Sequence, residues 1–410
     1  MKSKFTLVMT LVVAVITNTN AQWANVATNS TKSLRSVAFF GNQGLIGGTN
    51  GTIIHSADGG LTWDDSLYYN YDPVDAVAFA SATLAVAGSY KMYNSINGGA
   101  TFSGPYTVTN FNDFRDITFR TPTDGIAVDN FCQLARSTDG GQNWTASTIK
   151  PCGGSAELKD IDFPTSLVGY FCGHNGSVFK STDGGALWLP VTAPGASNVN
   201  YKAIGFTDAN TGFITGKTTS GQDTFVFKKT IDGGTSWIDL KKAIIAAGVK
   251  ATNIISSFSF LNSSIGYLID ENKIYKTTDG GTTWSLDFTS TAAGNAFFNK
   301  IVATPNVVMA VGQSGVAARL AGTSTGINEV NNTQEIFVYP NPSNNIITIG
   351  NIIINNESAF VEITDISGRK VKDEKISDNH LDISSFPKGL YFGKLYNGNG
   401  LNNNFKFVKQ

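Results

Sequence analysis

A pattern of eight residues that recurs six times constrains the fold of this chain more than any other feature. The pattern is Ser/Thr-x-Asp-Gly-Gly-x-x-Trp, and successive copies are 39 to 49 residues apart. Three short apolar segments of β character precede each copy and a fourth follows it. A period in the forties, with four short strands in each repeat, predicts the blades of a β-propeller. The copies start at Ser56, Ser95, Ser137, Ser181, Thr230 and Thr277.

A seventh repeat begins near Asn299 but stops after its third segment and has no octet. The segment 22–26 resembles the end of a repeat, with Trp23 in the position of the octet tryptophan. If this segment supplies the missing strand, the ring closes by pairing the two ends of the domain, and no open edge remains. The sequence therefore predicts an all-β fold with a seven-bladed propeller over residues 22–321. Six and eight blades are the alternatives.

The octet itself reads as a structural turn between the third and fourth strands. Its glycines tolerate the positive φ angles of a tight hairpin, and the acid before them can accept hydrogen bonds from the turn. The second copy has Asn97 in place of the acid and Phe102 in place of tryptophan, which argues against a metal or catalytic role. The acid positions are Asp58, Asn97, Asp139, Asp183, Asp232 and Asp279, and the aromatic positions are Trp63, Phe102, Trp144, Trp188, Trp237 and Trp284.

These octets resemble the Asp-box, or bacterial neuraminidase repeat, of sialidases and sortilin-type receptors. The stretches 41–56 and 310–319 resemble the photosystem II stability and assembly factor family most. The resemblance covers the whole predicted propeller and implies its fold. The photosynthetic role is not carried over, because nothing in the sequence points to a photosynthetic cell.

The first 21 residues read as a secretory signal peptide. Lys2 and Lys4 precede an apolar run over 5–16, and Ala21 ends a plausible cleavage site. That run is short for a bilayer span, and no later stretch is apolar enough, so we expect no transmembrane segment. The mature protein is expected to be exported.

A change of composition marks the C-terminal part of the chain. Residues 322–335 are small and polar, as in a linker. Residues 336–410 alternate short strands with turn residues and predict a small immunoglobulin-like β-sandwich. They closely resemble the type A sorting domain of the type IX secretion system of Bacteroidetes, with an ordinary immunoglobulin-like binding module as the alternative. The matching landmarks are Tyr339, Pro340, Asn341, Pro342, Gly368, Arg369, Gly389, Leu390 and Tyr391. The resemblance implies the type IX machinery as a partner, and a location outside the cell or on its surface.

Candidate binding residues lie in the loops on the propeller face opposite the octets. Aromatic side chains on loops suit recognition of sugars or proteins, although packing between blades is the plainer explanation. The candidates are Tyr68, Tyr69, Tyr71, Tyr90, Tyr106, Phe111 and His174. Cys132 and Cys152 map to neighbouring loops of the same face and predict a disulfide.

The net charge of −1 gives no sign of a nucleic-acid partner. We expect a monomeric binding or scaffold module for a protein or glycan, with no cofactor, no metal and no assigned catalytic residue. The alternative is a propeller-type glycoside hydrolase, sialidase-like or active on another polysaccharide. The Arg-Ile-Pro motif of sialidases is absent, and Glu157 and Glu271 are the only glutamates before the linker. Acidic residues clustered in the central channel would favour the hydrolase.

Overall fold

The computed structural model forms two compact units, residues 1–323 and 324–410. It describes residues 22–64, 67–68, 72–111, 113–148, 157–191, 198–219, 225–250, 253, 255–292, 296–321, 337–339, 341, 343–350, 359–366, 369–376, 380–396 and 402–410. In this part of the chain, no helix is long and apolar enough to cross a membrane.

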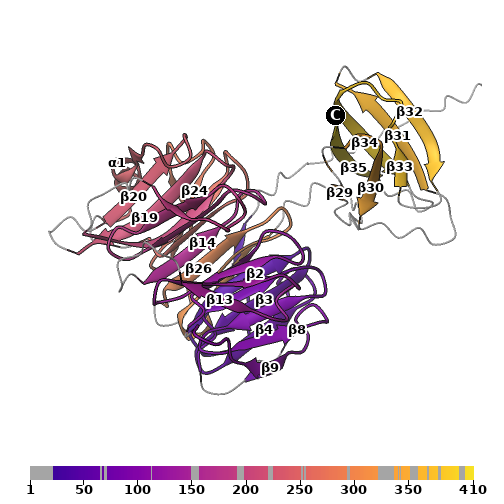
Figure 1. Ribbon diagram of the computed structural model, residues 1–410. Helices are drawn as coiled ribbons and strands as arrows, with labels where there is room; N and C mark the ends of the chain where they lie inside the picture. Colours follow the sequence, from indigo (N-terminus) through magenta and orange to yellow (C-terminus); the bar gives the residue numbers. More distant parts are fainter. Residues whose placement is uncertain are drawn as a thin grey trace, which may run out of the picture. The chain divides into compact units, whose positions relative to one another are not determined.

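Unit 1 contains seven antiparallel sheets of four strands each, which confirms the predicted propeller (Figure 1). In blades 1 to 6, strands that are consecutive in the chain pair with one another, and the first of them is the innermost. Blades 1 to 3 are β2 (Leu34–Phe40), β3 (Gln43–Gly48), β4 (Thr52–Ser56), β5 (Leu67–Tyr68); β6 (Ala76–Phe79), β7 (Ala85–Gly88), β8 (Met92–Ser95), β9 (Ser103–Tyr106); and β10 (Asp116–Phe119), β11 (Gly125–Val128), β12 (Gln133–Ser137), β13 (Thr145–Thr148).

Blades 4 to 6 follow the same order, and a short helix, α1, comes after blade 5. They are β14 (Leu158–Asp162), β15 (Gly169–Gly173), β16 (Val178–Ser181), β17 (Leu189–Pro190); β18 (Val199–Phe206), β19 (Gly212–Thr218), β20 (Phe225–Thr230), β21 (Ile238–Asp239), α1 (Lys241–Ala246); and β22 (Ser257–Phe260), β23 (Gly266–Asp270), β24 (Lys273–Thr277), β25 (Ser285–Thr289).

Blade 7 joins the two ends of the domain, as the sequence predicts. Its strands β26 (Phe298–Ala303), β27 (Val308–Gly312) and β28 (Ala317–Leu320) pair in order, and a 3-10 turn, η2 (Gln313–Gly315), links the last two. The fourth strand is β1 (Trp23–Asn25), in which Trp23 lies opposite Leu320. Figure 1 shows the orange β26 near the indigo β2, so the last blade completes the ring beside the first.

The octets form the turns that the sequence predicts. In blade 3, the Asp139 carboxylate accepts bonds from the Ser137 hydroxyl at 2.9 Å and from the Asn143 N–H at 2.9 Å. Gly140 and Gly141 have φ of 75° and 90°, which an L side chain adopts only with strain. In blade 2, the Asn97 amide oxygen accepts the same two kinds of bond, at 2.9 and 3.0 Å. The turn therefore needs an oxygen acceptor and not a negative charge.

The octet tryptophans fill the space between blades. Trp188 contacts Phe163 edge-on, with ring centroids 5.7 Å apart, and belongs to a core cluster that also contains Ile126 and Val128 of the preceding blade. Trp23 takes the same role in blade 7, where it stacks on Phe288. Large rings packed between the blades explain why the pattern repeats with them.

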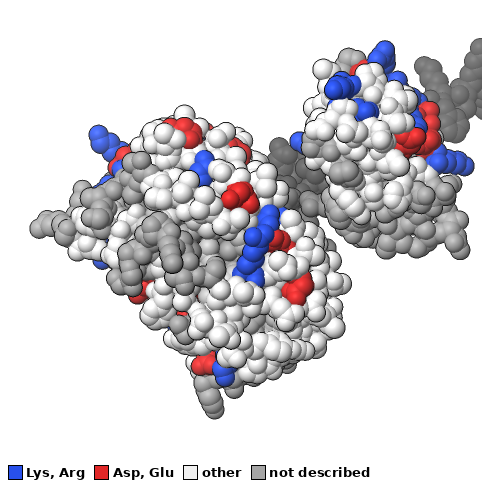
Figure 2. Space-filling view, in the orientation of Figure 1, with Lys and Arg blue, Asp and Glu red and all other residues white. Residues whose placement is uncertain are grey.

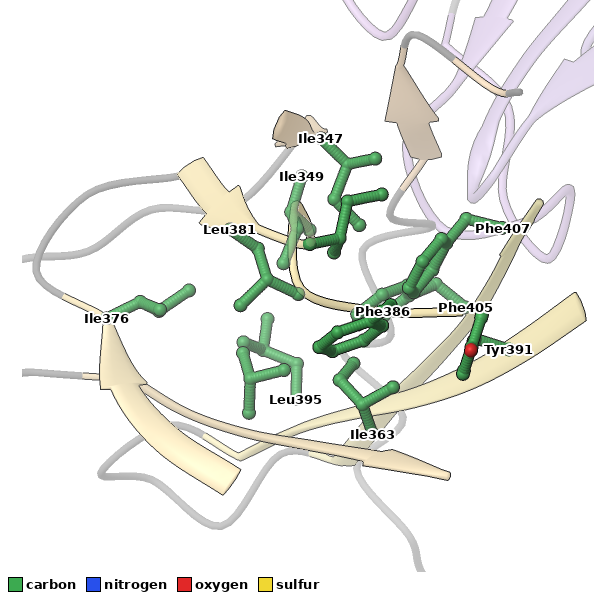
Figure 3. Packing of buried hydrophobic residues seen from close by; sticks show 12 residues of the cluster. Ile347, Ile349, Ile363, Ile376, Leu381, Phe386, Tyr391, Leu395, Phe405 and Phe407 are labelled. Atoms are coloured by element: carbon green, nitrogen blue, oxygen red, sulfur yellow. The ribbon is translucent and has the colours of Figure 1, made fainter. Parts of the chain in front are cut away.

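Unit 2 is a β-sandwich with sheet orders β29-β30-β33 and β32-β31-β34-β35. Its core consists of apolar side chains from both sheets (Figure 3), and Tyr391 donates from its hydroxyl to the Pro387 carbonyl at 2.7 Å. Asn341 ties the start of the domain to its last strand, accepting from the Val408 N–H at 2.9 Å. The strands are β29 (Phe337–Tyr339), β30 (Ile346–Gly350), β31 (Ala359–Asp365), β32 (Lys370–Ile376), β33 (His380–Asp382), β34 (Gly389–Tyr396) and β35 (Asn402–Lys409).

Candidate functional site

A network of charged side chains lies at the mouth of the propeller channel, near the start of the inner strands of successive blades. Arg35 of blade 1 bonds Asp75 of blade 2 at 2.6 Å, and Asp75 also bonds Arg115 of blade 3 at 3.2 Å. Arg115 reaches Asp113 at 2.6 Å and donates to Asn130 at 2.7 Å. With these three acceptors, the Arg115 guanidinium is largely committed to holding the loops of blades 2 and 3 in place.

The network continues over blades 4 and 5 as a cationic rim, which we define as Lys159, His174, Lys202 and Lys217. Lys159 pairs with Glu157 at 2.6 Å, and His174 Nδ1 lies 3.4 Å from the same carboxylate. Lys202 and Lys217 are exposed. Desolvation by its neighbours, followed by the positive charge of Lys159, lowers the pKa of Lys202. Desolvation and Lys159 also lower the pKa of His174. One carboxylate thus faces several cations, and an anionic ligand would relieve their repulsion.

Figure 2 shows Lys and Arg atoms gathered in a stripe with acidic atoms beside it, on the propeller face turned to the viewer. Much of the surrounding surface carries neither charge. The stripe is the largest group of Lys and Arg atoms on this face, whereas acidic atoms also lie at separate places on it.

The predicted aromatic residues do not form one platform. Tyr90 and Tyr106 are 53% and 47% exposed, as a binding role requires. Phe111 is buried and packs on Phe114 with centroids 4.6 Å apart, so it belongs to the core and not to a binding surface. Tyr69 and Tyr71 lie outside the described residues. Tyr68 pairs with Thr52 in the sheet, and its side chain is not described.

The disulfide between Cys132 and Cys152 stays a prediction, because only one of the two residues is described. Cys132 is disulfide-bonded, but Cys152 lies outside the described residues. Cys172 is a free thiol buried inside blade 4, where burial raises its pKa well above the ordinary value. It is therefore an inert core residue at neutral pH. Among the described residues, no group of three or more His, Cys, Asp or Glu could hold a metal ion.

Inside the ring, the inner strands of all seven blades line a channel cavity of about 410 Å³. Asp116 of blade 3 and Asp160 and Asp162 of blade 4 line it, together with Lys300 of blade 7. The Lys300 ammonium lies 3.3 Å from Asp160, so this side chain crosses the channel to the far side of the ring. The sequence offers Asp116 and Asp160 among possible carboxylates of a hydrolase, with no spacing that favours them. It does not reveal that they share the channel with Asp162 and Lys300. Polar residues alternate with apolar ones along the inner strands, and this alternation is the only sign of the group in the sequence. It does not show which residues face the channel until the positions of the strands in the blades are known.

The channel carboxylates accept backbone hydrogen bonds from the next blade. Asp160 accepts from the Ile204 N–H at 2.8 Å, and Asp162 accepts from the Phe206 N–H at 2.7 Å. Serines make the equivalent bonds between other blades, including Ser36 to the Val77 N–H at 3.1 Å. Because a neutral hydroxyl does the same work elsewhere in the ring, the shared role of these residues is to join adjacent inner strands. Further bonds of this kind are accepted by Asp116, Ser257 and Ser259.

Burial in the channel nevertheless raises the pKa values of two of its acids. Burial, with Asp160 close by, raises the pKa of Asp162 to about 7. Burial also raises the pKa of Asp116 above its ordinary value, and the facing Asp160 adds to the shift while Lys300 opposes it. Both acids therefore favour the protonated form more strongly than an exposed carboxyl does.

These shifts predict that the propeller loses stability as pH rises from about 4 to 7, because the folded acids hold protons that the unfolded acids release. Replacing Asp162 with asparagine keeps the oxygen acceptor for the Phe206 N–H and removes the charge. We expect Asp162→Asn to abolish roughly 1–4 kcal/mol of this loss, since one pKa unit is worth 1.36 kcal/mol. Urea unfolding at several pH values measures the effect. Asp239→Asn, at an exposed acid, is the control, and equal pH profiles for the wild type and Asp162→Asn would contradict the assignment.

Comparison with known protein families identifies the C-terminal domain. Residues 337–410 match the family described as "Secretion system C-terminal sorting domain". The chain is therefore a cargo of type IX secretion and is located at the cell surface or outside the cell. No curated protein matches the sequence.

Solved structures confirm the propeller fold. A structure titled "YCF48 bound to D1 peptide" is 17% identical with a TM-score of 0.57, and the match covers 74% of this chain and 98% of that one. YCF48 from Cyanidioschyzon merolae is 20% identical with a TM-score of 0.57, over 73% and 99% of the two chains. The GH74 xyloglucanase from Xanthomonas campestris is 13% identical with a TM-score of 0.57, over 81% and 60%. At these identities the likeness concerns the fold alone.

Proposed function

We propose that the chain is an exported binding module that holds an anionic segment of a protein partner at the channel mouth. The proposal includes the predicted order of signal peptide 1–21, propeller 22–321, linker 322–335 and sorting domain 336–410, with the propeller acting as a monomer. The observation that carries it is the cationic rim, where several basic side chains crowd around the single carboxylate of Glu157.

A protein is favoured over a glycan as the partner for two reasons. The lysines of the rim come from the first two strands of neighbouring blades, so they are spaced along an arc that an extended chain with several carboxylates can follow. A protein of similar fold has also been solved with a peptide bound. An anionic glycan also carries carboxylates, so the experiment below includes one as an alternative ligand.

Charge reversal at the rim provides that test. We expect the full chain to bind a fluorescent oligoglutamate peptide, and Lys159→Glu/Lys202→Glu to weaken binding at least about tenfold, a loss of about 1.4 kcal/mol. Fluorescence anisotropy at two salt concentrations measures it, and binding should weaken as salt rises because exposed charges are screened.

The control variant is Lys394→Glu/Lys406→Glu, which makes the same change of net charge at exposed positions of the sorting domain. Equal loss of binding in both variants would contradict a rim site and indicate a general charge effect. Binding of oligogalacturonate but not of the peptide would show that the partner is a glycan.

A glycoside hydrolase is the second candidate, because three aspartates do cluster in the channel and two of them have raised pKa values. Paired carboxyl groups with different pKa values are what acid–base hydrolysis of a glycosidic bond requires. The backbone bonds that these aspartates accept favour a structural role instead. Release of reducing sugar from a polysaccharide by the wild type, and its loss in Asp160→Asn, would support the hydrolase.

A further inference from the structure

A second cavity lies away from the channel, in the side of the ring between blades 2 and 3. It has a volume of about 420 Å³, within the range of small-ligand sites. Strands β8 and β9 of blade 2 and the segment after β9 form one wall. The octet turn of blade 3 forms the other. We call this cavity the side groove.

The octet tryptophan at this junction is less deeply buried than several of the others. Trp144, the octet tryptophan of blade 3, is only partly buried, whereas Trp63, Trp188 and Trp284 are 5–7% exposed. The Trp144 indole N–H donates to the Gly141 carbonyl at 2.9 Å, which fixes the ring against the groove.

Aromatic rings and uncharged polar groups line the side groove. Tyr106, which is 47% exposed, contributes a second ring. Asn94, Gln142 and Asn143 contribute amides, and none of the described lining residues is charged. This composition is the opposite of the cationic rim.

Asn94 lines the groove, and its side-chain oxygen has no hydrogen-bond partner among the described residues. Its amide N–H donates to the Gln142 carbonyl at 3.0 Å, which sets the orientation of the side chain. The amide oxygen is buried and accepts no hydrogen bond among the described residues. A buried acceptor without a donor is costly, so a hydroxyl group brought into the groove would be favoured there.

We infer that the side groove is a binding site for a neutral oligosaccharide. Sugar rings present C–H faces that pack on aromatic rings, and their hydroxyl groups donate to and accept from side-chain amides. A charged ligand would find no counter-charge among the described lining residues. A purely apolar ligand would offer no hydrogen bonds to the amide groups that line the groove. This site is separate from the cationic rim and does not depend on the function proposed for it.

Titration of the full chain with uncharged tetrasaccharides tests the inference. The probes are cellotetraose, maltotetraose and chitotetraose, with tetragalacturonate as the charged comparison, and isothermal titration calorimetry with tryptophan fluorescence gives the affinities. We expect at least one neutral probe to bind, Tyr106→Ala to weaken it about tenfold through loss of the ring contact, and Gln142→Ala to weaken it less.

Tyr90→Ala is the matched control, because Tyr90 is 53% exposed on the same blade and does not line the groove. Its affinity should stay within about twofold of the wild type. Failure of every neutral probe at millimolar concentration would overturn the inference. So would an equal effect of Tyr106→Ala and Tyr90→Ala, or tighter binding of tetragalacturonate than of the neutral probes. Thermal melting of each variant shows that the fold is intact.

Discussion

Replacing Trp23 with alanine destabilises the propeller by about 3–5 kcal/mol, the usual cost of deleting a buried aromatic side chain. Trp23 is 5% exposed, stacks on Phe288, contacts Tyr267 edge-on, and donates to Asp287 at 2.6 Å. All these partners belong to blade 6, so the substitution loosens the contact between the closing strand and its neighbouring blade. Chemical denaturation followed by circular dichroism measures the change.

Asn25→Ala is the control for Trp23→Ala because it alters an exposed residue of the same strand. We expect it to change stability by less than about 1 kcal/mol. If Trp23→Ala has an effect as small as this, β1 is not needed to hold the ring closed, and the role assigned to it is wrong.

Lys300→Met has an effect of similar size for an electrostatic reason. The substitution keeps most of the apolar stem of the side chain. It removes the ammonium, which faces Asp160 and favours the ionised form of Asp116. Breaking a buried ion pair by removing one partner costs about 3–5 kcal/mol, because the remaining charge is left uncompensated. The cost should be largest near pH 8 and smaller near pH 5, where Asp116 and Asp162 are protonated because their pKa values are raised.

Melting temperatures at the two pH values measure the effect of Lys300→Met. The matched control is Lys228→Met, which breaks a surface pair with Asp239 at 3.7 Å and is expected to cost less than about 1 kcal/mol. Equal effects of the two variants would mean that Lys300 contributes no more than a surface lysine.

The repeat made most of the fold predictable from the sequence. The octet gives the position of the turn before each fourth strand, and the missing octet near Asn299 together with Trp23 identifies how the ring closes. The landmarks of the sorting domain, such as Asn341 and Tyr391, were recognisable because their spacing in the chain is local.

The candidate sites were less predictable because they depend on contacts between blades. Lys300 and Asp160 are 140 residues apart in the chain and meet only across the closed ring. Phe111 was expected on a binding face but lies in the core, since its segment turns inward onto Phe114. The side groove lies between residues of two blades, 92–108 and 142–144, and neither segment alone signals a cavity. Of the predicted binding residues that the structure describes, Tyr106 is the one that lines it.

The pairing of β1 with β28 also determines when the ring can close during folding. Trp23 and its partner Leu320 are separated by roughly 300 residues, so this contact has close to the highest sequence separation that the domain allows. The first strand to leave the ribosome, or to cross a membrane, is therefore among the last to be paired. Until then β28 presents a bare edge, and the half-assembled ring is prone to join other chains. The propeller therefore reaches its final shape only after its whole chain has been delivered, and the edge of β28 is exposed to wrong pairing until then.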